Sequence, residues 1–157
     1  MILVIGYGNP LRSDDASGQH VAWELKQRFG QDDLLVQIDY QLTPEMAELV
    51  SHFDDVVFID ARVGETPGAV IQEAVRPLTG AGAFTHNVTP AALLGIANDL
   101  YGSTSSGILI SIVGDVFAYG THLSPGLGRL LPTITRQVSD IIKQRTNIEK
   151  RGENHHA

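Results

Sequence analysis

Short apolar runs rich in β-branched residues recur along the chain, and stretches with helical periodicity separate most of them. The runs occupy residues 2–6, 34–40, 55–61, 68–75 and 107–114. Continuously apolar runs of this length, bounded by glycine or polar residues, are typical of strands that are buried on both faces. Because strands and helices alternate, we expect an α/β sheet with helices covering both of its faces.

Four helices are expected between and after these strands. The first follows the opening loop and ends near Phe29, where a glycine acts as a stop signal. The second and third begin with Thr-Pro, which supplies a capping hydroxyl and a proline at the first helical position, and they span 43–53 and 89–101. The last helix follows "LSPG" and keeps leucine, isoleucine and valine side chains on one face as far as Ile142.

One connection departs from this alternation. Only "RVGETP" (62–67) separates the third and fourth strands, which is too short for a crossover between parallel strands, so the fourth strand should be antiparallel. The sequence therefore predicts an α/β single-domain three-layer sandwich, with a mostly parallel, twisted sheet of about five strands between helices on both faces. The domain should cover residues 1–143, and the polar residues 144–157 should form a flexible tail.

Composition excludes several classes of function. The 157 residues include no cysteine, which rules out disulfides, thiolate metal sites and cysteine nucleophiles. A net charge of −7, with 11 Lys and Arg, gives no electrostatic support for binding nucleic acid or an anionic membrane. No apolar run approaches the roughly 20 residues of a membrane span. The opening "MILVIGYG" lacks the basic region and cleavage site of a signal peptide. We expect a cytoplasmic protein without nucleic-acid or membrane partners.

The first strand leads into the loop "GYGNPLRSDDASG", residues 6–18. In a nucleotide-binding α/β protein this position holds a phosphate loop, which gathers backbone N–H groups and often a lysine. Here the loop carries Asp14 and Asp15 instead. A positively charged partner or a metal ion is therefore a better first interpretation than a phosphate.

Three potential metal ligands should meet at one edge of the sheet. Functional crevices of open α/β sheets lie outside the carboxyl ends of the parallel strands. Asp15 follows the first strand and Asp60 ends the third, while His86 lies in "GAGAFTHNVTP", from which an extended chain could return to that edge. Two carboxylates and one imidazole, with positions left open, suit a divalent metal ion.

Simpler interpretations remain open for each of these residues. Asp14 or Asp15 could cap the first helix or interact with its dipole, and Asp60 could be held by an ion pair with Arg62. If His86 lies at the opposite edge, His122 in "GTHLSPG" is the first alternative ligand. No Ser-His-Asp ordering or His-Glu-x-x-His motif is visible, so serine-type and zincin mechanisms have little support.

Together these motifs resemble the hydrogenase maturation proteases. "GYGNPLRSDDASG" is similar to that family's opening signature, "VVFIDA" resembles its second motif, and "FTHNVTPAALL" resembles its third, a histidine-bearing loop before a proline-started helix. The resemblance extends over roughly residues 1–143. It implies an endopeptidase that removes a C-terminal extension from the large-subunit precursor of a nickel–iron hydrogenase once nickel is in place.

The resemblance also implies roles for individual residues. Asp15, Asp60 and His86 would contact nickel that arrives with the substrate, and the two aspartates would take part in catalysis, of an aspartic or a metal-assisted type. We expect Asn9, Asp14 and His122 to contact the substrate. The first metal ligand is Glu in some members and Asp in others, as here. Some members carry the histidine just after the helix-starting proline, where this chain has alanine.

Two other functions fit the same residues. The chain could be a nickel checkpoint or assembly factor that inspects the precursor without cutting it, or an α/β module that binds an unrelated small ligand. Shortening of a nickel-loaded large subunit by the purified protein would distinguish the peptidase from both.

Overall fold

The computed structural model describes residues 1–80 and 88–155, with side chains described as far as residue 147. The strands are β1 (Ile2–Tyr7), β2 (Leu34–Asp39), β3 (Asp55–Val63), β4 (Val70–Val75) and β5 (Ser106–Gly114). The α-helices are α1 (Ser17–Arg28), α2 (Ala47–Ser51), α3 (Pro90–Tyr101) and α4 (Pro125–His155), and two 3₁₀ turns, η1 (Ser13–Ala16) and η2 (Pro44–Met46), precede α1 and α2.

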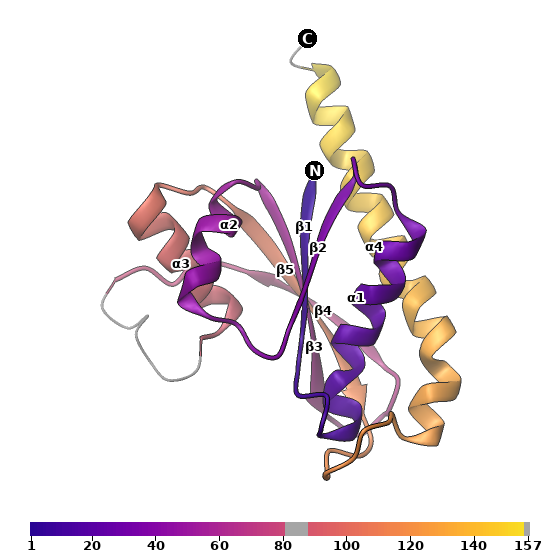
Figure 1. Cartoon of the computed structure of the whole chain (residues 1–157). Helices are drawn as coiled ribbons and strands as arrows, with labels where there is room; N and C mark the ends of the chain where they lie inside the picture. Colours follow the sequence, from indigo (N-terminus) through magenta and orange to yellow (C-terminus); the bar gives the residue numbers. More distant parts are fainter. Residues whose placement is uncertain (81–87, 156–157) are drawn as a thin grey trace.

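The five strands form one sheet in the order β2-β1-β3-β5-β4. The first three neighbouring pairs are parallel, and β4 pairs antiparallel with β5. In Figure 1, α1 and α4 lie on one side of the sheet and α2 and α3 on the other. These findings confirm the predicted three-layer sandwich and the antiparallel fourth strand, because the connection after β3 is too short for anything but a turn.

Each face of the sheet has its own apolar core. On one face, Val21 and Leu25 of α1 and Ile134 and Val138 of α4 pack over alternate residues of the central strands. On the other face, α2 and α3 pack over the intervening residues, with Phe58 the largest fully buried side chain. Because successive side chains of a strand point to opposite faces, a strand buried on both sides must be apolar throughout. This is why β1, β3 and β5 were recognisable as continuous apolar runs.

The first helix lies unusually close to β1 and β3, and two glycines allow it. A Cβ on Gly6 would lie 2.4 Å from the Cβ of Ala22, and a Cβ on Gly18 would lie 2.4 Å from the carbonyl oxygen of Ile59. Neither contact is possible for a real side chain, so the backbones of α1 and both strands can approach only because these positions are glycine. The close packing fixes the start of α1, and with it the loop that follows β1, beside Ile59 of β3.

The ends of two predicted helices differ from the structure. The second helix begins as a 3₁₀ turn and its α-helical part covers only Ala47–Ser51. The last helix continues to His155 instead of ending near residue 143, since good helix formers follow Ile142 for several residues with no intervening proline. The guanidinium of Arg145 also bonds the Asp55 carboxylate, with Nε 2.8 Å from Oδ2, and this contact holds the helix against the start of β3.

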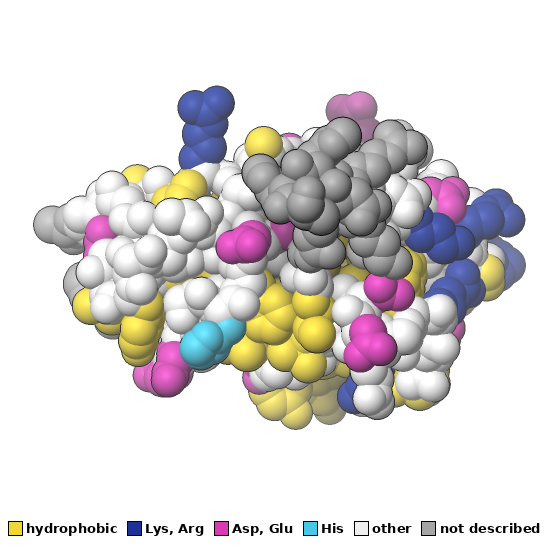
Figure 2. All heavy atoms as spheres, turned by 90° about the horizontal axis from the view of Figure 1, so that it is seen from above, with side chains coloured by type: hydrophobic (Ala, Val, Ile, Leu, Met, Phe, Trp, Pro, Cys, Tyr) yellow, Lys and Arg dark blue, Asp and Glu magenta, His cyan; other side chains and the backbone are white. Residues whose placement is uncertain are grey.

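The two ends of the sheet differ in character. Figure 2 shows the end at which β1 begins, where acidic and basic side chains are scattered and the basic ones gather toward the side of α1 and α4. Lys26 and Arg28 in the last turn of α1 interact favourably with its dipole. Among the described residues, no helix combines the length and hydrophobicity needed to cross a membrane. The predicted site belongs to the opposite end, where the parallel strands finish.

Candidate active site

Asp15 and Asp60 line a single cleft of about 200 Å³, together with Tyr7, Gly8 and residues of the segment that follows β2. The sequence predicted this meeting from the parallel strand ends, and the structure confirms that the two side chains share one cleft. Both are partly buried. His86, the third predicted ligand, lies outside the described residues.

Asp60 does not end its strand, although it was expected to. The pairing of β1 with β3 ends at Gly6 and Ile59, whereas β3 continues beside β5 as far as Val63. Asp60 is therefore the first residue of β3 beyond the pairing with β1. The shorter neighbouring strand leaves space beside it, and the cleft occupies that space.

The turn after β1 holds the Asp15 carboxylate in place. The backbone N–H of Asn9 donates to Oδ2 of Asp15 at 2.7 Å, and the Asn9 side-chain oxygen accepts from the N–H of Leu11 at 2.9 Å. Gly8 has φ of 154°, and a Cβ there would lie 1.9 Å from the carbonyl oxygen of Asp15. The Gly-Asn pair thus forms the tight turn that aims Asp15 at the cleft. Asn9 was predicted to contact substrate, and in the structure its side chain stabilises this turn.

The surroundings of Asp60 favour a protonated carboxyl group. The pKa of Asp60 is raised to about 6, with burial as the largest cause. Hydrogen bonds from the Ala61 N–H and the Tyr7 side chain act to lower it, and the charge of Asp15 acts to raise it. The Ala61 N–H lies 2.7 Å from Oδ1 of Asp60. At this pKa the group exchanges a proton close to neutral pH, as a general acid or base must.

Arg62 does not neutralise Asp60. Its Nη1 atom lies 3.1 Å from Oε1 of Glu73 on the antiparallel strand β4, in an exposed ion pair. The ion pair with Arg62 that was expected for a structural Asp60 is therefore not formed. The groups that bond the Asp60 carboxylate are the Ala61 N–H and the Tyr7 side chain.

Tyr7 is a site residue that sequence reasoning missed. It is the last residue of β1 and lines the cleft beside Asp60. Burial raises the pKa of the Tyr7 phenol, and the charge of Asp60 and a hydrogen bond with it act in the same direction. Tyr7 therefore stays a neutral donor toward the carboxylate. A hydroxyl group at the end of an otherwise apolar strand, directly before the glycine turn, was the signal that could have found it.

Asp14 does not line the cleft; its side chain links the loop after β1 to the segment between β5 and α4. Its side chain is fully buried, and Oδ2 accepts from the N–H groups of Asp115 and Val116 at 2.8 and 2.9 Å, while Oδ1 accepts from the Ser124 N–H at 2.7 Å. The Ser124 hydroxyl donates to Oδ2 at 2.7 Å. Burial alone would raise the pKa of Asp14, but these hydrogen bonds hold it below its usual value. We infer a structural role for Asp14 in place of the predicted substrate contact.

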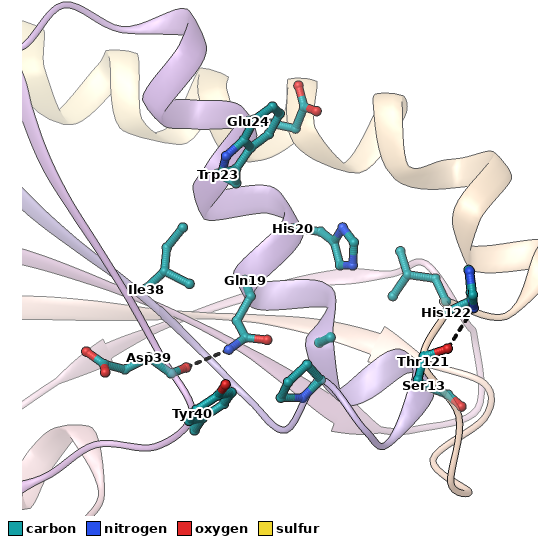
Figure 3. A pocket seen from close by; sticks show the side chains of 13 residues that line it. Ser13, Gln19, His20, Trp23, Glu24, Ile38, Asp39, Tyr40, Thr121 and His122 are labelled. Carbon is teal, nitrogen blue, oxygen red and sulfur yellow. Dashed lines mark hydrogen bonds between the residues drawn. The ribbon is translucent and has the colours of Figure 1, made fainter.

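His122 lies in a neighbouring hollow of about 670 Å³, here called the α1 groove. The groove runs over the exposed side of α1, between the end of β2 and residues 121–123 (Figure 3). Nδ1 of His122 lies 3.0 Å from the Thr121 hydroxyl oxygen. His122 thus lines the groove and is absent from the residues that line the cleft of Asp15 and Asp60. Within residues 1–80 and 88–147, no three acidic or histidine side chains are grouped closely enough to hold a metal ion.

Several solved structures of similar fold are hydrogenase maturation proteases. The maturation protease HycI from Thermococcus kodakarensis KOD1 superposes with a TM-score of 0.70 and 24% identity, over 90% of this chain and 92% of that one. The hydrogenase maturating endopeptidase HybD from E. coli superposes with a TM-score of 0.66 and 22% identity, over 92% of this chain and 93% of that one. The maturation protease HybD from Thermococcus kodakarensis superposes with a TM-score of 0.59 and 18% identity, over 90% of this chain and 98% of that one.

These likenesses establish a common fold over nearly the full length of both chains. No protein-family model matches the sequence, and no curated protein matches it. What the chain does must therefore be argued from its own cleft together with this fold.

Proposed function

We propose that the protein is a cytoplasmic endopeptidase that removes the C-terminal extension of a nickel–iron hydrogenase large-subunit precursor after nickel insertion. The observation that carries the proposal is the cleft that both Asp15 and Asp60 line, with the pKa of Asp60 raised to about 6. The fold shared with hydrogenase maturation proteases supports the same reaction class. The sequence motifs that resemble that family contain both aspartates.

Two carboxyl groups that line one cleft can together hydrolyse a peptide bond. In this proposal one carboxylate takes the proton of the attacking water and the other carboxyl group gives a proton to the leaving amine. Asp60, which binds a proton near pH 6, is suited to hold and release it. Tyr7 donates toward Asp60 and orients it, while the Asn9 N–H fixes Asp15.

Nickel enters this proposal as part of the substrate. The two carboxylates of the cleft are oxygen donors, which suit a divalent ion, and no cysteine is present that could remove nickel from its thiolate ligands in the precursor. Asp15 and Asp60 would contact the ion, with His86 proposed as the third ligand. An ion held beside the scissile bond can polarise the carbonyl group that water attacks.

The test is cleavage of the precursor by purified protein, observed as a loss of mass. Wild-type protein should shorten nickel-loaded precursor, and Asp15→Asn and Asp60→Asn should not. Asp54→Asn, an exposed aspartate before the start of β3, is the matched control and should process normally. Binding of the nickel-loaded precursor without any loss of mass would contradict the peptidase and favour a checkpoint protein instead.

A further inference from the structure

We propose that Ser13 is a positioning residue for Asp15. A left-handed backbone at Ser13, held by hydrogen bonds to residues 117–120, directs the Asp15 carboxylate toward the cleft. The inference rests on the proposed function, because it takes Asp15 as a group that takes part in cleavage. Ser13 does not line the cleft, so it acts through the turn to which both residues belong.

Ser13 has an unusual backbone conformation. Its φ is 49°, and within the part of the chain that the structure describes it is the only non-glycine residue with a positive φ. In this region the Cβ of an L-residue crowds the following carbonyl oxygen, so residues other than glycine stay there only when surrounding contacts hold them. Strained residues of this kind cluster at active sites, where they fix the direction of a functional group.

Ser13 lies inside the turn that ends at Asp15. The Asp15 N–H donates to the Arg12 carbonyl oxygen at 3.1 Å, so Ser13 and Asp14 are the two central residues of this turn. The carboxylate of Asp15 then accepts from the Asn9 N–H at 2.7 Å. Because φ of Ser13 sets the path of the chain through the turn, it sets the direction of the Asp15 side chain relative to Asn9 and the cleft.

Residues 117–120, which lie between β5 and α4, hold Ser13 in this conformation. The Ser13 N–H donates to the Gly120 carbonyl oxygen at 3.0 Å, and the Ser13 hydroxyl donates to the Ala118 carbonyl oxygen at 2.9 Å. The Gly120 N–H donates in return to the Leu11 carbonyl oxygen at 2.9 Å. Ser13 is only 7% exposed, so water competes little for these bonds. The segment after β5 thus fixes the turn that carries Asp15.

The approach of Gly120 to Ser13 leaves no space for a side chain. A Cβ on Gly120 would lie 2.6 Å from the Ser13 hydroxyl oxygen, which is too short for a non-bonded contact. A side chain at Gly120 must therefore displace the hydroxyl from the Ala118 carbonyl oxygen. Gly120→Ala is a second way to break this hydrogen bond, and it leaves the residues of the turn unchanged.

The test combines processing kinetics with hydrogen exchange of the protein without substrate. Ser13→Ala removes the hydroxyl but keeps the Cβ that opposes a positive φ, so kcat for nickel-loaded precursor should fall about tenfold. Gly120→Ala should have the same effect. Ser13→Gly removes the hydroxyl and the strain together, and it should stay within about threefold of wild type because glycine adopts positive φ readily. The Asn9 N–H, which bonds the Asp15 carboxylate, should exchange about tenfold faster in Ser13→Ala than in wild type.

Ser105→Ala is the matched control. Ser105 is 6% exposed, and its hydroxyl donates to the Val50 carbonyl oxygen at 3.1 Å. It directly precedes β5 and therefore lies at the end of the sheet opposite the cleft. This change removes a buried serine hydroxyl from a backbone carbonyl, as Ser13→Ala does. It should lower the free energy of unfolding but leave kcat and the exchange of the Asn9 N–H unchanged.

The outcomes separate the role of Ser13 from the proposed function. If wild-type protein does not cut the precursor, the peptidase is wrong, and exchange of the Asn9 N–H still decides whether Ser13 positions Asp15. If wild type cuts and Ser13→Ala has the same kcat and the same exchange, the peptidase stands and the role of Ser13 is refuted. A loss of kcat in Ser13→Gly as large as that in Ser13→Ala would also overturn the inference. If Ser13→Ala does not fold, the same comparisons with Gly120→Ala decide.

Discussion

Replacing Asp60 by asparagine should make the folded protein more stable at pH 8 while it abolishes processing. The pKa of this carboxyl group rises from its usual 3.8 to about 6 on folding, with burial as the largest cause. A group that binds a proton more tightly in the folded state stabilises that state below the unfolded pKa. This contribution is lost as the pH rises through about 6. Above pH 6 the ionised carboxylate therefore opposes folding.

The size of the effect follows from the two pKa values. At 1.36 kcal/mol per pKa unit, the rise from 3.8 to about 6 corresponds to about 3 kcal/mol at pH 8. Asp60 is only partly buried, so solvent screening reduces this, and we expect a gain of roughly 1–3 kcal/mol in the free energy of unfolding. At pH 4 the same linkage predicts a gain of at most about 0.6 kcal/mol in the free energy of unfolding. Asparagine keeps an oxygen that can accept from the Ala61 N–H.

The assay is urea unfolding of wild type and Asp60→Asn at pH 4 and pH 8, with the precursor cleavage assay on the same preparations. Asp54→Asn is the control and should change stability by no more than about 0.5 kcal/mol at either pH. If the free energies of unfolding of Asp60→Asn and wild type differ by the same amount at both pH values, the linkage argument is refuted. A large loss of stability at pH 8 would show that the carboxylate is structural after all.

Four further outcomes are expected. Asp14→Asn should lower the free energy of unfolding by about 2–4 kcal/mol at pH 7, measured in urea, because it weakens a buried carboxylate that four donors share. That loss should shrink as the pH falls through the lowered pKa of Asp14. Tyr7→Phe removes a hydrogen bond that lowers the pKa of Asp60, so the limb of the pH–rate profile that reports Asp60 should move to higher pH. Gly8→Ala should destabilise the fold and impair processing together, since the new Cβ would meet the Asp15 carbonyl at 1.9 Å; unchanged thermal unfolding would contradict this. Purified protein should hold little metal by elemental analysis, and nickel-free precursor should stay uncut; one tightly held zinc per chain with equal cutting of both precursors would refute the nickel mechanism.

The sequence predicted the elements of the fold well because their signals are local. A strand buried on both faces must be apolar throughout, and Thr89 with Pro90 starts α3 by a side-chain cap to the Ala92 N–H at 3.1 Å. The short connection between β3 and β4 permits only an antiparallel pair. Helix ends were less predictable, because the end of α4 depends partly on a contact between Arg145 and Asp55, 90 residues apart.

The sequence by itself also determined that Asp15 and Asp60 would meet, since parallel strands bring their carboxyl ends to one edge of the sheet. Only the tertiary structure decided what surrounds them. Asp14 and Asp15 are adjacent and chemically identical, yet one lies in the cleft and the other is buried among donors more than 100 residues away. The raised pKa of Asp60 likewise depends on burial and on Tyr7 and Asp15, which only the packed sheet places beside it. A carboxylate's chemistry follows from its neighbours in space, and for these residues most of those neighbours are distant in sequence.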